Sequence, residues 1–178
     1  MIAVMETERL ILRPFDAGDV PFILRLLNEP SFIENIGDRG VRTPEDAQRY
    51  LADGPIASYA RHGHGLWLVA LKETLEPIGM CGLLKRDQLP DVDLGYAFLP
   101  GFWSSGYAHE AARATLEWAR SRGMDRIVAI VSPGNTRSIR LLEKLGFAFE
   151  GLTTTSPDAP PVAIYGVRLG DAALANSS

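Results

Sequence analysis

Residues 99–108 contain the strongest candidate for chemistry in this chain of 178 residues. Gly101 and Gly106 interrupt a stretch that follows an alternating apolar segment and precedes a helical pattern. A junction between a strand and a helix presents free N–H groups and the positive end of a helix dipole, which together suit a pyrophosphate. Gly106 lacks the Cβ that would hold an anion away from the main chain, and Ala108 keeps the first helical turn narrow. The segment favours an anion site, and a glycine turn required for geometry alone is the alternative.

Two familiar phosphate motifs are excluded at this position. Gly101 and Gly106 have the spacing of a P-loop, but Tyr107 and Ala108 stand where lysine and serine or threonine would be required. The fingerprint G-x-G-x-x-G does not occur either, which disfavours a dinucleotide-binding unit.

Other side chains are candidates for proton transfer. Asp93 lies on the small, acidic face of a predicted strand, where it could accept a proton from an ammonium group directly or through water; an exposed carboxylate without a role is the alternative. His62, His64 and His109 are other possible bases, and exposed surface histidines are the default expectation for them. Cys81 is expected to be a small buried strand residue, because no base adjoins it in a nucleophile motif. No ligand set for a metal stands out.

The elements on either side of the loop must position these groups. Residues 91–99 alternate in polarity, so we expect a strand with one packed face and one small, acidic face. From Gly106 to Gly123 the period changes to about 3.6, which predicts a helix. Residues 127–131 are uniformly apolar and predict a strand buried on both faces. Asn135 is expected to cap a further helix that ends at Gly146. The packed face of the first strand would carry Val92, Leu94, Tyr96 and Phe98.

The remaining elements are shorter. Helices are expected from Asp19 to about Asn28 and from Thr43 to about Tyr59, the second interrupted at Gly54-Pro55. The stretch between them, 29–40, is rich in turn residues, and the tail at 171–178 is polar enough to fray. The order predicts a mixed α/β fold with a mostly antiparallel central sheet flanked by helices, in a single domain over residues 1–170. Further strands are expected at 10–14, 66–71, 78–84, 147–152 and 162–169.

Composition and charge restrict the kinds of partner. Hydrophobic residues make up 46% of the chain and charged residues 22%, as expected of a globular protein. The net charge of −4 argues against a nucleic-acid partner and is compatible with a cationic acceptor or with solubility alone. No apolar run approaches the roughly 20 residues that span a bilayer. We therefore expect no membrane partner and, since there is one cysteine and no secretion signal, a cytoplasmic location.

Four segments carry a resemblance to a known family. They are Glu-Thr-Glu-Arg-Leu-Ile-Leu-Arg-Pro-Phe at 6–15, Leu-Gly-Tyr at 94–96, Trp-Ser-Ser-Gly-Tyr-Ala-His-Glu-Ala at 103–111, and Asn-Thr-Arg-Ser-Ile-Arg-Leu-Leu-Glu-Lys-Leu-Gly-Phe at 135–147. In this order and spacing they resemble the GNAT N-acetyltransferases, and within them the RimJ/RimL-type branch of ribosomal-protein N-acetyltransferase-like proteins. The resemblance covers nearly the whole chain.

The resemblance implies that acetyl-CoA is the cosubstrate and that a cofactor cleft splits the sheet. It places the pyrophosphate on the loop at 104–108 and the pantetheine arm along the backbone of Phe98 and Leu99. Asn135 and Ser138 would contact the pantetheine and the sulfur end. The cofactor-binding residues so implied are Phe98, Leu99, Ser104, Ser105, Gly106, Tyr107, Ala108, Asn135 and Ser138.

The chain departs from the family pattern in two ways that affect the site. Many relatives have a basic residue or glutamine in the pyrophosphate loop, and here Arg137 or Arg140 would have to supply the missing cation. The tyrosine that acts as general acid in many relatives falls at Leu142, which has no proton to donate. Ser138 or water is then the candidate proton source for the departing thiolate.

The expected activity is direct transfer of acetyl from acetyl-CoA to a primary amine, either a protein N-terminus or a small molecule. The N–H of Leu99 or Phe98 would polarise the thioester carbonyl, and Asp93 would act as the base. No covalent enzyme intermediate and no metal are expected. A non-catalytic acyl-CoA sensor is the main alternative, because the family tyrosine is missing, and a scaffold with an empty cleft is a third interpretation. Both a monomer and a homodimer are compatible with the sequence.

Overall fold

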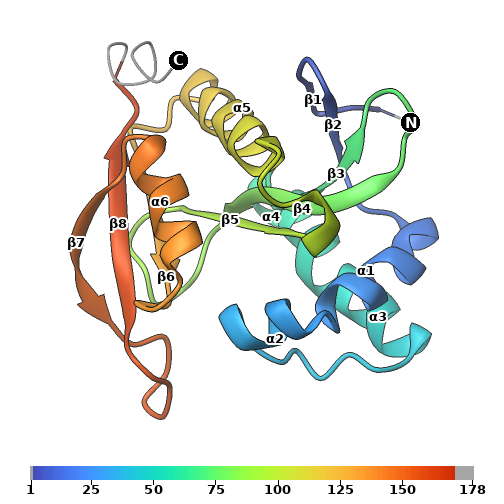
Figure 1. Ribbon diagram of the computed structural model, residues 1–178, viewed down its shortest axis with the longest axis horizontal. Coiled ribbons are helices and arrows are strands. Elements are labelled where there is room, and N and C mark those ends of the chain that lie inside the picture. Colours follow the sequence, from blue (N-terminus) through green and yellow to red (C-terminus); the bar gives the residue numbers. More distant parts are fainter. Residues whose placement is uncertain (1, 171–178) are drawn as a thin grey trace.

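A single mixed sheet forms the frame of the molecule (Figure 1). The structure is a computed structural model that describes residues 2–170, so the tail at 171–178, which was expected to fray, lies outside the described residues. The strand order is β1-β2-β3-β4-β5-β6-β8-β7, and β5 and β6 are parallel while the other neighbouring pairs are antiparallel. The predicted mixed, mostly antiparallel sheet is thus confirmed. The strands are β1 (Met5–Glu6), β2 (Leu10–Arg13), β3 (Leu66–Leu71), β4 (Pro77–Leu84), β5 (Asp93–Phe98), β6 (Arg126–Val131), β7 (Ala148–Thr153) and β8 (Val162–Arg168).

Helices cover the two faces of this sheet (Figure 1). One face carries α5, which contacts β2, β4 and β5, and α6, which contacts β6. The N-terminal helices α1, α2 and α3 pack on the opposite face. The helices are α1 (Val20–Leu27), α2 (Pro30–Asn35), α3 (Pro44–Leu51), α4 (Ala57–His62), α5 (Tyr107–Ser121) and α6 (Thr136–Lys144), with short turns of helix at η1 (Ala17–Asp19), η2 (Ala52–Ile56) and η3 (Pro100–Phe102).

Each face of the sheet has its own hydrophobic core. Under α5 and α6 the core includes Leu94 and Phe98 of β5, whereas Ala97 of the same strand belongs to the core under α1 to α3. Alternate residues of β5 therefore contribute to two cores, one on each face of the sheet. The expectation of one packed face and one small, acidic face is wrong. Asp93, on the supposedly acidic face, is 1% exposed.

The second predicted helix continues where an interruption was expected. Thr43 caps α3 as predicted, since its hydroxyl accepts a hydrogen bond from the Asp46 N–H at 3.1 Å. At Gly54-Pro55 the helix widens into the π-helical turn η2 and then continues as α4. A wider turn accommodates Pro55, which has no N–H to donate. In the turn-rich stretch at 29–40 the structure forms α2, with Pro30 at its start.

The sheet opens between β5 and β6. These two strands pair at Asp93 and Val128, where the Val128 N–H donates to the Val92 carbonyl at 3.0 Å. Their outer neighbours remain paired along their lengths, from Gly79 opposite Phe98 to Leu84 opposite Asp93 on one side. Beyond Asp93 the edge of β5 that faces β6 therefore has main-chain groups outside the ladder.

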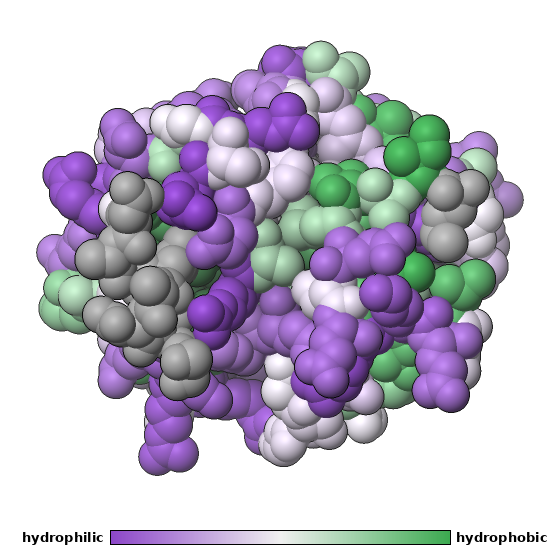
Figure 2. All heavy atoms as spheres, turned by 90° about the horizontal axis from the view of Figure 1, so that it is seen from above, coloured by the Kyte–Doolittle hydropathy of each residue, from purple (hydrophilic) through white to green (hydrophobic). Residues whose placement is uncertain are grey.

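Hydrophilic side chains cover most of the face seen from above in Figure 1, on the side of α5, and smaller hydrophobic areas lie between them (Figure 2). Among the described residues, no helix combines the length and the apolar character that crossing a membrane requires.

Candidate functional site

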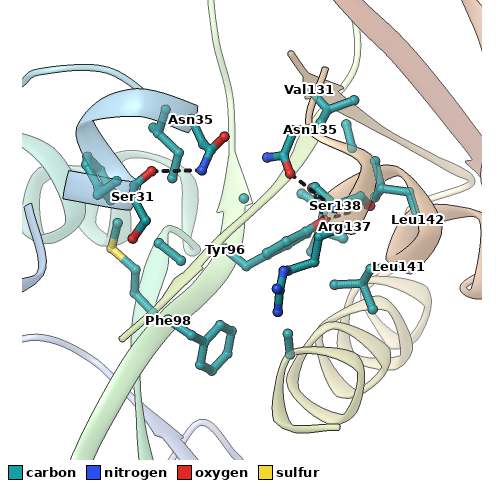
Figure 3. Close-up of a pocket in the computed structure, with 18 of the residues that line it drawn as sticks. Ser31, Asn35, Tyr96, Phe98, Val131, Asn135, Arg137, Ser138, Leu141 and Leu142 are labelled. Carbon is teal, nitrogen blue, oxygen red and sulfur yellow. Dashed lines mark hydrogen bonds between the residues drawn. The ribbon is translucent and has the colours of Figure 1, made fainter. Parts of the chain in front are cut away.

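A cavity of about 650 Å³ occupies the opening between β5 and β6 (Figure 3). This volume is within the roughly 300–1,000 Å³ typical of ligand pockets. We call it the cleft. One wall is β5 with the loop at 99–106 and the first turn of α5, and the other is the end of β6 with α6. Helix α2 and Tyr50 close it at the far end.

The backbone of β5 decides which amide can serve the cleft. The Leu99 N–H donates to the Ile78 carbonyl of β4 at 2.9 Å, so it is already engaged. Backbone groups of a strand point alternately to its two neighbours, so the Phe98 N–H points the other way, toward the opening. The Phe98 carbonyl accepts a hydrogen bond from the Trp103 indole at 2.9 Å. The expectation that the Leu99 N–H polarises a bound carbonyl is therefore wrong, and Phe98, the other amide proposed, is the available one.

The main chain of the loop at 99–106 forms a concave surface of N–H groups. Ser104 and Gly106 have positive φ values, +64° and +84°. Such left-handed residues turn successive N–H groups to one side, which makes an anion-binding concavity. Gly106 also precedes α5 without a side chain to cap it, so the first N–H groups of the helix are available. Ser104, Gly106, Tyr107 and Ala108 line the cleft, whereas Ser105 does not.

Arg9 fixes this loop from the other end of the chain. Its guanidinium donates to the Ser105 carbonyl at 3.0 Å and to Glu110 in the first turn of α5 at 2.9 Å. It also lies 4.3 Å from the centre of the Tyr107 ring. The Thr7 hydroxyl bonds to Glu110 at 2.6 Å. Burial opposes ionisation of Glu110, but the hydrogen bonds from Thr7 and Arg9 together lower its pKa. Arg9 lies in one of the segments that resemble the family, but the sequence did not reveal its contact with the loop. The contact joins residues that are about a hundred positions apart in the chain.

Of the two arginines proposed as the missing cation, Arg137 is the one at the loop. It donates to the Ser104 hydroxyl at 3.2 Å and lies 4.4 Å over the Trp103 ring. It also lines the cleft. Arg140 is exposed and lies outside the lining, so its expected role in cofactor binding is corrected in favour of Arg137. On a helix, position 140 lies at the edge of the face that carries 137, 141 and 144.

Asn135 and Ser138 lie together at the start of α6. The Asn135 side chain accepts a hydrogen bond from the Ser138 N–H at 3.3 Å, the N-cap role predicted for it (Figure 3). Both residues line the cleft. Leu142, one turn later, is 1% exposed and packs in the core below α5 and α6.

Tyr96 is a site residue that sequence reasoning missed. Its hydroxyl crosses from β5 to Ser138 and lies 2.6 Å from the serine Oγ. Burial raises the pKa of Tyr96 to about 12, although the hydrogen bond with Ser138 acts in the opposite direction. The Leu-Gly-Tyr segment contributes to the family resemblance. Alternation along the strand, however, predicted that the Tyr96 ring lies on a packed face, so it gave no indication of a role in the site.

Asp93 is buried and paired, so the alternative of an exposed strand carboxylate is wrong. The Arg86 Nε lies 3.2 Å from each of its two carboxylate oxygens. Burial raises the pKa of Asp93, and Arg86 opposes that rise. Both residues line the cleft near the point where β5 still pairs with β6. A carboxylate with a raised pKa at such a place is suited to accepting a proton.

Two of the three histidines, His64 and His109, differ from the expected surface exposure, whereas His62 matches it. His64 is 5% exposed, its Nδ1 lies 3.0 Å from the Leu83 carbonyl, and burial lowers its pKa. His109 lines the cleft, and its buried Nε2 has no hydrogen-bond partner among the described residues. Burial, and then the charges of Lys144 and Arg113, lower the pKa of His109. His62 is exposed and stacks on His64.

Cys81 is fully buried in the core, as expected, with its sulfur 3.4 Å from the Thr115 hydroxyl. Burial raises the pKa of its thiol to about 12, so the thiol is inert at neutral pH. Within residues 2–170, the structure brings together no group of three or more His, Cys, Asp or Glu side chains that could hold a metal ion.

Comparisons with known proteins agree on one family. Residues 9–148 match the family model described as the acetyltransferase (GNAT) domain. The chain is 30% identical over 151 residues to the uncharacterized N-acetyltransferase p20 of Bacillus licheniformis, an alignment that covers 82% of this chain and 83% of that protein. It is 35% identical to the uncharacterized protein YkkB of Bacillus subtilis, but that alignment spans 58% of this chain and 61% of YkkB.

Two solved structures have the same fold. An acetyltransferase from Agrobacterium tumefaciens superposes with a TM-score of 0.77 at 29% identity, covering 94% of this chain and 95% of that one. RimL, a ribosomal L7/L12 alpha-N-protein acetyltransferase solved with coenzyme A, superposes with a TM-score of 0.81, covering 94% and 98% of the two chains. RimL is 18% identical, so it supports the fold alone.

Proposed function

This chain belongs to the GNAT acetyltransferase family, and from that premise we propose that it transfers acetyl directly to a primary amine inside the cleft between β5 and β6. Membership makes it an N-acetyltransferase that uses acetyl-CoA. The roles of its residues and the kind of amine are our proposal. The observation that carries it is the free edge of β5 beside the uncapped start of α5.

The diphosphate end of acetyl-CoA is assigned to the loop at 104–108. The left-handed Ser104 and Gly106 and the start of α5 offer main-chain N–H groups and the positive end of the helix dipole. Arg137 adds the cation. Ser105 contributes indirectly, because its carbonyl faces Arg9 and thereby helps to hold the loop. The residues present therefore fit a diphosphate.

The acyl end is assigned to β5 and the start of α6. Pantetheine amides would pair with the free edge of β5, and Asn135 and Ser138 would contact the arm near the sulfur. The Phe98 N–H would then hold the oxygen of the thioester carbonyl and stabilise the charge that develops on it. Neither Cys81 nor Ser138 has an adjacent base, which supports direct attack by the amine.

Asp93 is assigned as the base that accepts a proton from the attacking amine, directly or through water. Its burial raises its pKa, which makes it a better acceptor than an exposed carboxylate. An alkyl ammonium with a pKa of about 10.4 is mostly protonated at neutral pH, whereas an α-amino group near 7.7–8.0 is much less so. The candidate acceptors are a protein N-terminus and a small amine. An α-amino group depends less on proton transfer to Asp93, because a larger fraction of it is already unprotonated at neutral pH.

The acceptor would enter past α2, where Ser31, Phe32 and Asn35 line the cleft, and past Tyr50. This end of the cleft combines apolar and polar side chains, as a site for one particular amine requires. Because the one cysteine is a buried thiol, the chain needs no oxidising compartment, and we place it in the cytoplasm.

A thiol-release assay tests the proposal. The purified chain is mixed with acetyl-CoA and a panel of N-terminal peptides and small primary amines, while binding of acetyl-CoA is measured by calorimetry. We expect binding, together with release of free coenzyme A thiol in the presence of at least one amine class. Binding without release across the panel would favour the acyl-CoA sensor, and absence of binding would favour the empty scaffold.

A further inference from the structure

Two hydroxyl groups meet across the cleft. Tyr96 comes from β5, beyond the point where β5 and β6 separate, and Ser138 comes from the first turn of α6 (Figure 3). Their oxygen atoms are 2.6 Å apart, a short O–H···O hydrogen bond. The Tyr96 hydroxyl is also 3.4 Å from the Ser138 carbonyl. The pair therefore links the two walls at the place assigned above to the sulfur end of acetyl-CoA.

The chemistry of the two groups gives the hydrogen bond a direction. A phenol is a stronger acid than an aliphatic alcohol, so Tyr96 donates and Ser138 accepts. The Ser138 O–H is then free to point elsewhere, and Asn135 fixes the backbone that carries it. Because burial raises the pKa of Tyr96 to about 12, the phenol keeps its proton throughout the physiological range.

The other phenols of the cleft have different surroundings. Tyr107 lies under the Arg9 guanidinium at the diphosphate loop, and Tyr50 belongs to α3 at the far end. The position at which many relatives have their acidic tyrosine is the buried Leu142. Among the described phenols that line the cleft, Tyr96 is the one in contact with Ser138.

We propose that Tyr96 and Ser138 form a two-hydroxyl proton relay, in which Ser138 protonates the departing thiolate while Tyr96 orients and resupplies Ser138. This inference rests on the proposed function. The Ser138 hydroxyl touches the leaving sulfur and is catalytic, whereas Tyr96 acts through it and is a positioning residue. The relay replaces the tyrosine of α6 with one from the opposite wall.

The reaction moves one proton from the amine nitrogen to the departing sulfur. The amine nitrogen attacks the thioester carbon, a C–N bond forms, and the carbonyl electron pair moves to oxygen. When this oxyanion collapses, the C–S bond breaks and its electron pair goes to sulfur, which takes the proton of Ser138. Ser138 takes the proton of Tyr96. The proton lost by the nitrogen returns to Tyr96 through Asp93 and solvent water, so the products are the amide and the coenzyme A thiol.

Tyr96→Phe tests the relay because it removes the hydroxyl and keeps the ring. We expect kcat to fall roughly 100-fold, the lower end of the loss typical for a proton-transfer group, because Tyr96 acts through Ser138. KM for acetyl-CoA should stay within about twofold, because Phe98 and the loop at 104–108 hold the cofactor. Tyr165→Phe is the matched control, since Tyr165 is buried in β8 outside the cleft lining. A wild-type kcat in Tyr96→Phe would overturn the relay.

The double variant separates a relay from two independent packing effects. Ser138→Ala should reduce kcat at least as much as Tyr96→Phe, and the double variant should lose no more than Ser138→Ala alone. Losses that multiply would also overturn the relay, even when both single variants are impaired.

A measurement with the product needs no knowledge of the acceptor. Coenzyme A is bound to each protein, and the pKa of its thiol is followed by thiolate absorbance against pH. A Ser138 O–H aimed at the sulfur stabilises the thiolate, so the wild type should lower the thiol pKa, and both single variants should raise it again. The same thiol pKa in all proteins contradicts the relay alone. A wild-type protein that binds no coenzyme A contradicts the proposed function itself.

Discussion

The cleft has a cofactor end, the loop at 99–106 with the first turn of α5, and an acceptor end, α2 with Tyr50. The cofactor end presents mainly main-chain groups: the Phe98 N–H, the left-handed turns at Ser104 and Gly106, and the start of α5. The acceptor end presents the side chains of Ser31, Phe32, Asn35 and Tyr50 instead.

This difference has a physical consequence. Main-chain recognition depends on φ, ψ and the absence of a Cβ, so it tolerates many side chains nearby and fails when the backbone is changed. Side-chain recognition depends on the identity of each residue, and one substitution removes one contact. One cofactor can therefore be retained by the first end while different amines are selected at the second.

Gly106→Glu should break the cofactor end most severely. A residue with a Cβ is strained by roughly 1–2 kcal/mol in the left-handed region, and a carboxylate beside a diphosphate repels it. An added Cβ would also meet the Arg9 guanidinium at 3.3 Å. We expect the Kd for acetyl-CoA, measured by calorimetry, to rise at least about 100-fold.

Gly54→Glu is the control for bulk and charge. Gly54 lies in η2, outside the cleft lining, with no heavy atom within 4 Å of an added Cβ. It should bind acetyl-CoA as the wild type does. If folded Gly106→Glu also binds normally, the diphosphate lies elsewhere and the contrast between the two ends disappears.

Asp93→Asn should affect the chemistry between the two ends. We expect kcat to fall about 100-fold while the Kd for acetyl-CoA is unchanged, because Asp93 is assigned to the amine. Burial raises the pKa of Asp93, so its basic form is lost as pH falls through that raised value. The wild-type rate should decline on that acidic limb, and the Asn variant should not show it.

The thermal midpoint of Asp93→Asn serves as its control. The substitution leaves the Arg86 guanidinium without its carboxylate partner, so the Tm should fall as well. A lower Tm with full activity from pH 6 to pH 9 would make Asp93 a structural partner of Arg86 and assign no proton transfer to it.

The cofactor end could be anticipated from the sequence because its signals are local. The change from alternation to helical period, Gly106 and the Asn135 cap all lie within short segments, and each corresponds to a feature of the structure. The order of most elements along the chain and a sheet flanked by helices followed from the same kind of local pattern, helped by the family resemblance.

Other parts could not be anticipated, because they depend on contacts between distant segments. The Tyr96 hydroxyl reaches a helix 42 positions away, and Arg9 reaches Glu110 across 101 positions. Alternation predicted that Asp93 lies on one face of β5 but could not show that its carboxylate is buried and paired with Arg86. The Leu99 amide was misassigned because the hydrogen-bonding phase of a strand depends on its neighbour.

Arg137→Ala should weaken the cofactor end by less than a change in the backbone does. Loss of one charge-assisted contact corresponds to about a 10-fold rise in the Kd for acetyl-CoA, and the difference from the wild type should shrink at high salt. Arg140→Ala, an exposed residue of the same helix, is the control and should bind normally. Equal losses in both variants would indicate a general effect of charge in place of a contact at Ser104.

Asn35→Ala should produce the smallest effect, and it should appear at the acceptor end alone. The Asn35 side chain extends from α2 toward the cleft, where its amide bonds to the Ser31 carbonyl at 3.0 Å (Figure 3). The substitution would remove one neutral hydrogen bond between the Asn35 side chain and the bound amine substrate. That loss corresponds to about a 3-fold rise in KM for the amine, with the Kd for acetyl-CoA unchanged. Glu34→Ala, on the exposed side of the same helix, should change neither value. If Asn35→Ala instead weakens acetyl-CoA binding, then α2 belongs to the cofactor end, and the division of the cleft into a main-chain half and a side-chain half is wrong.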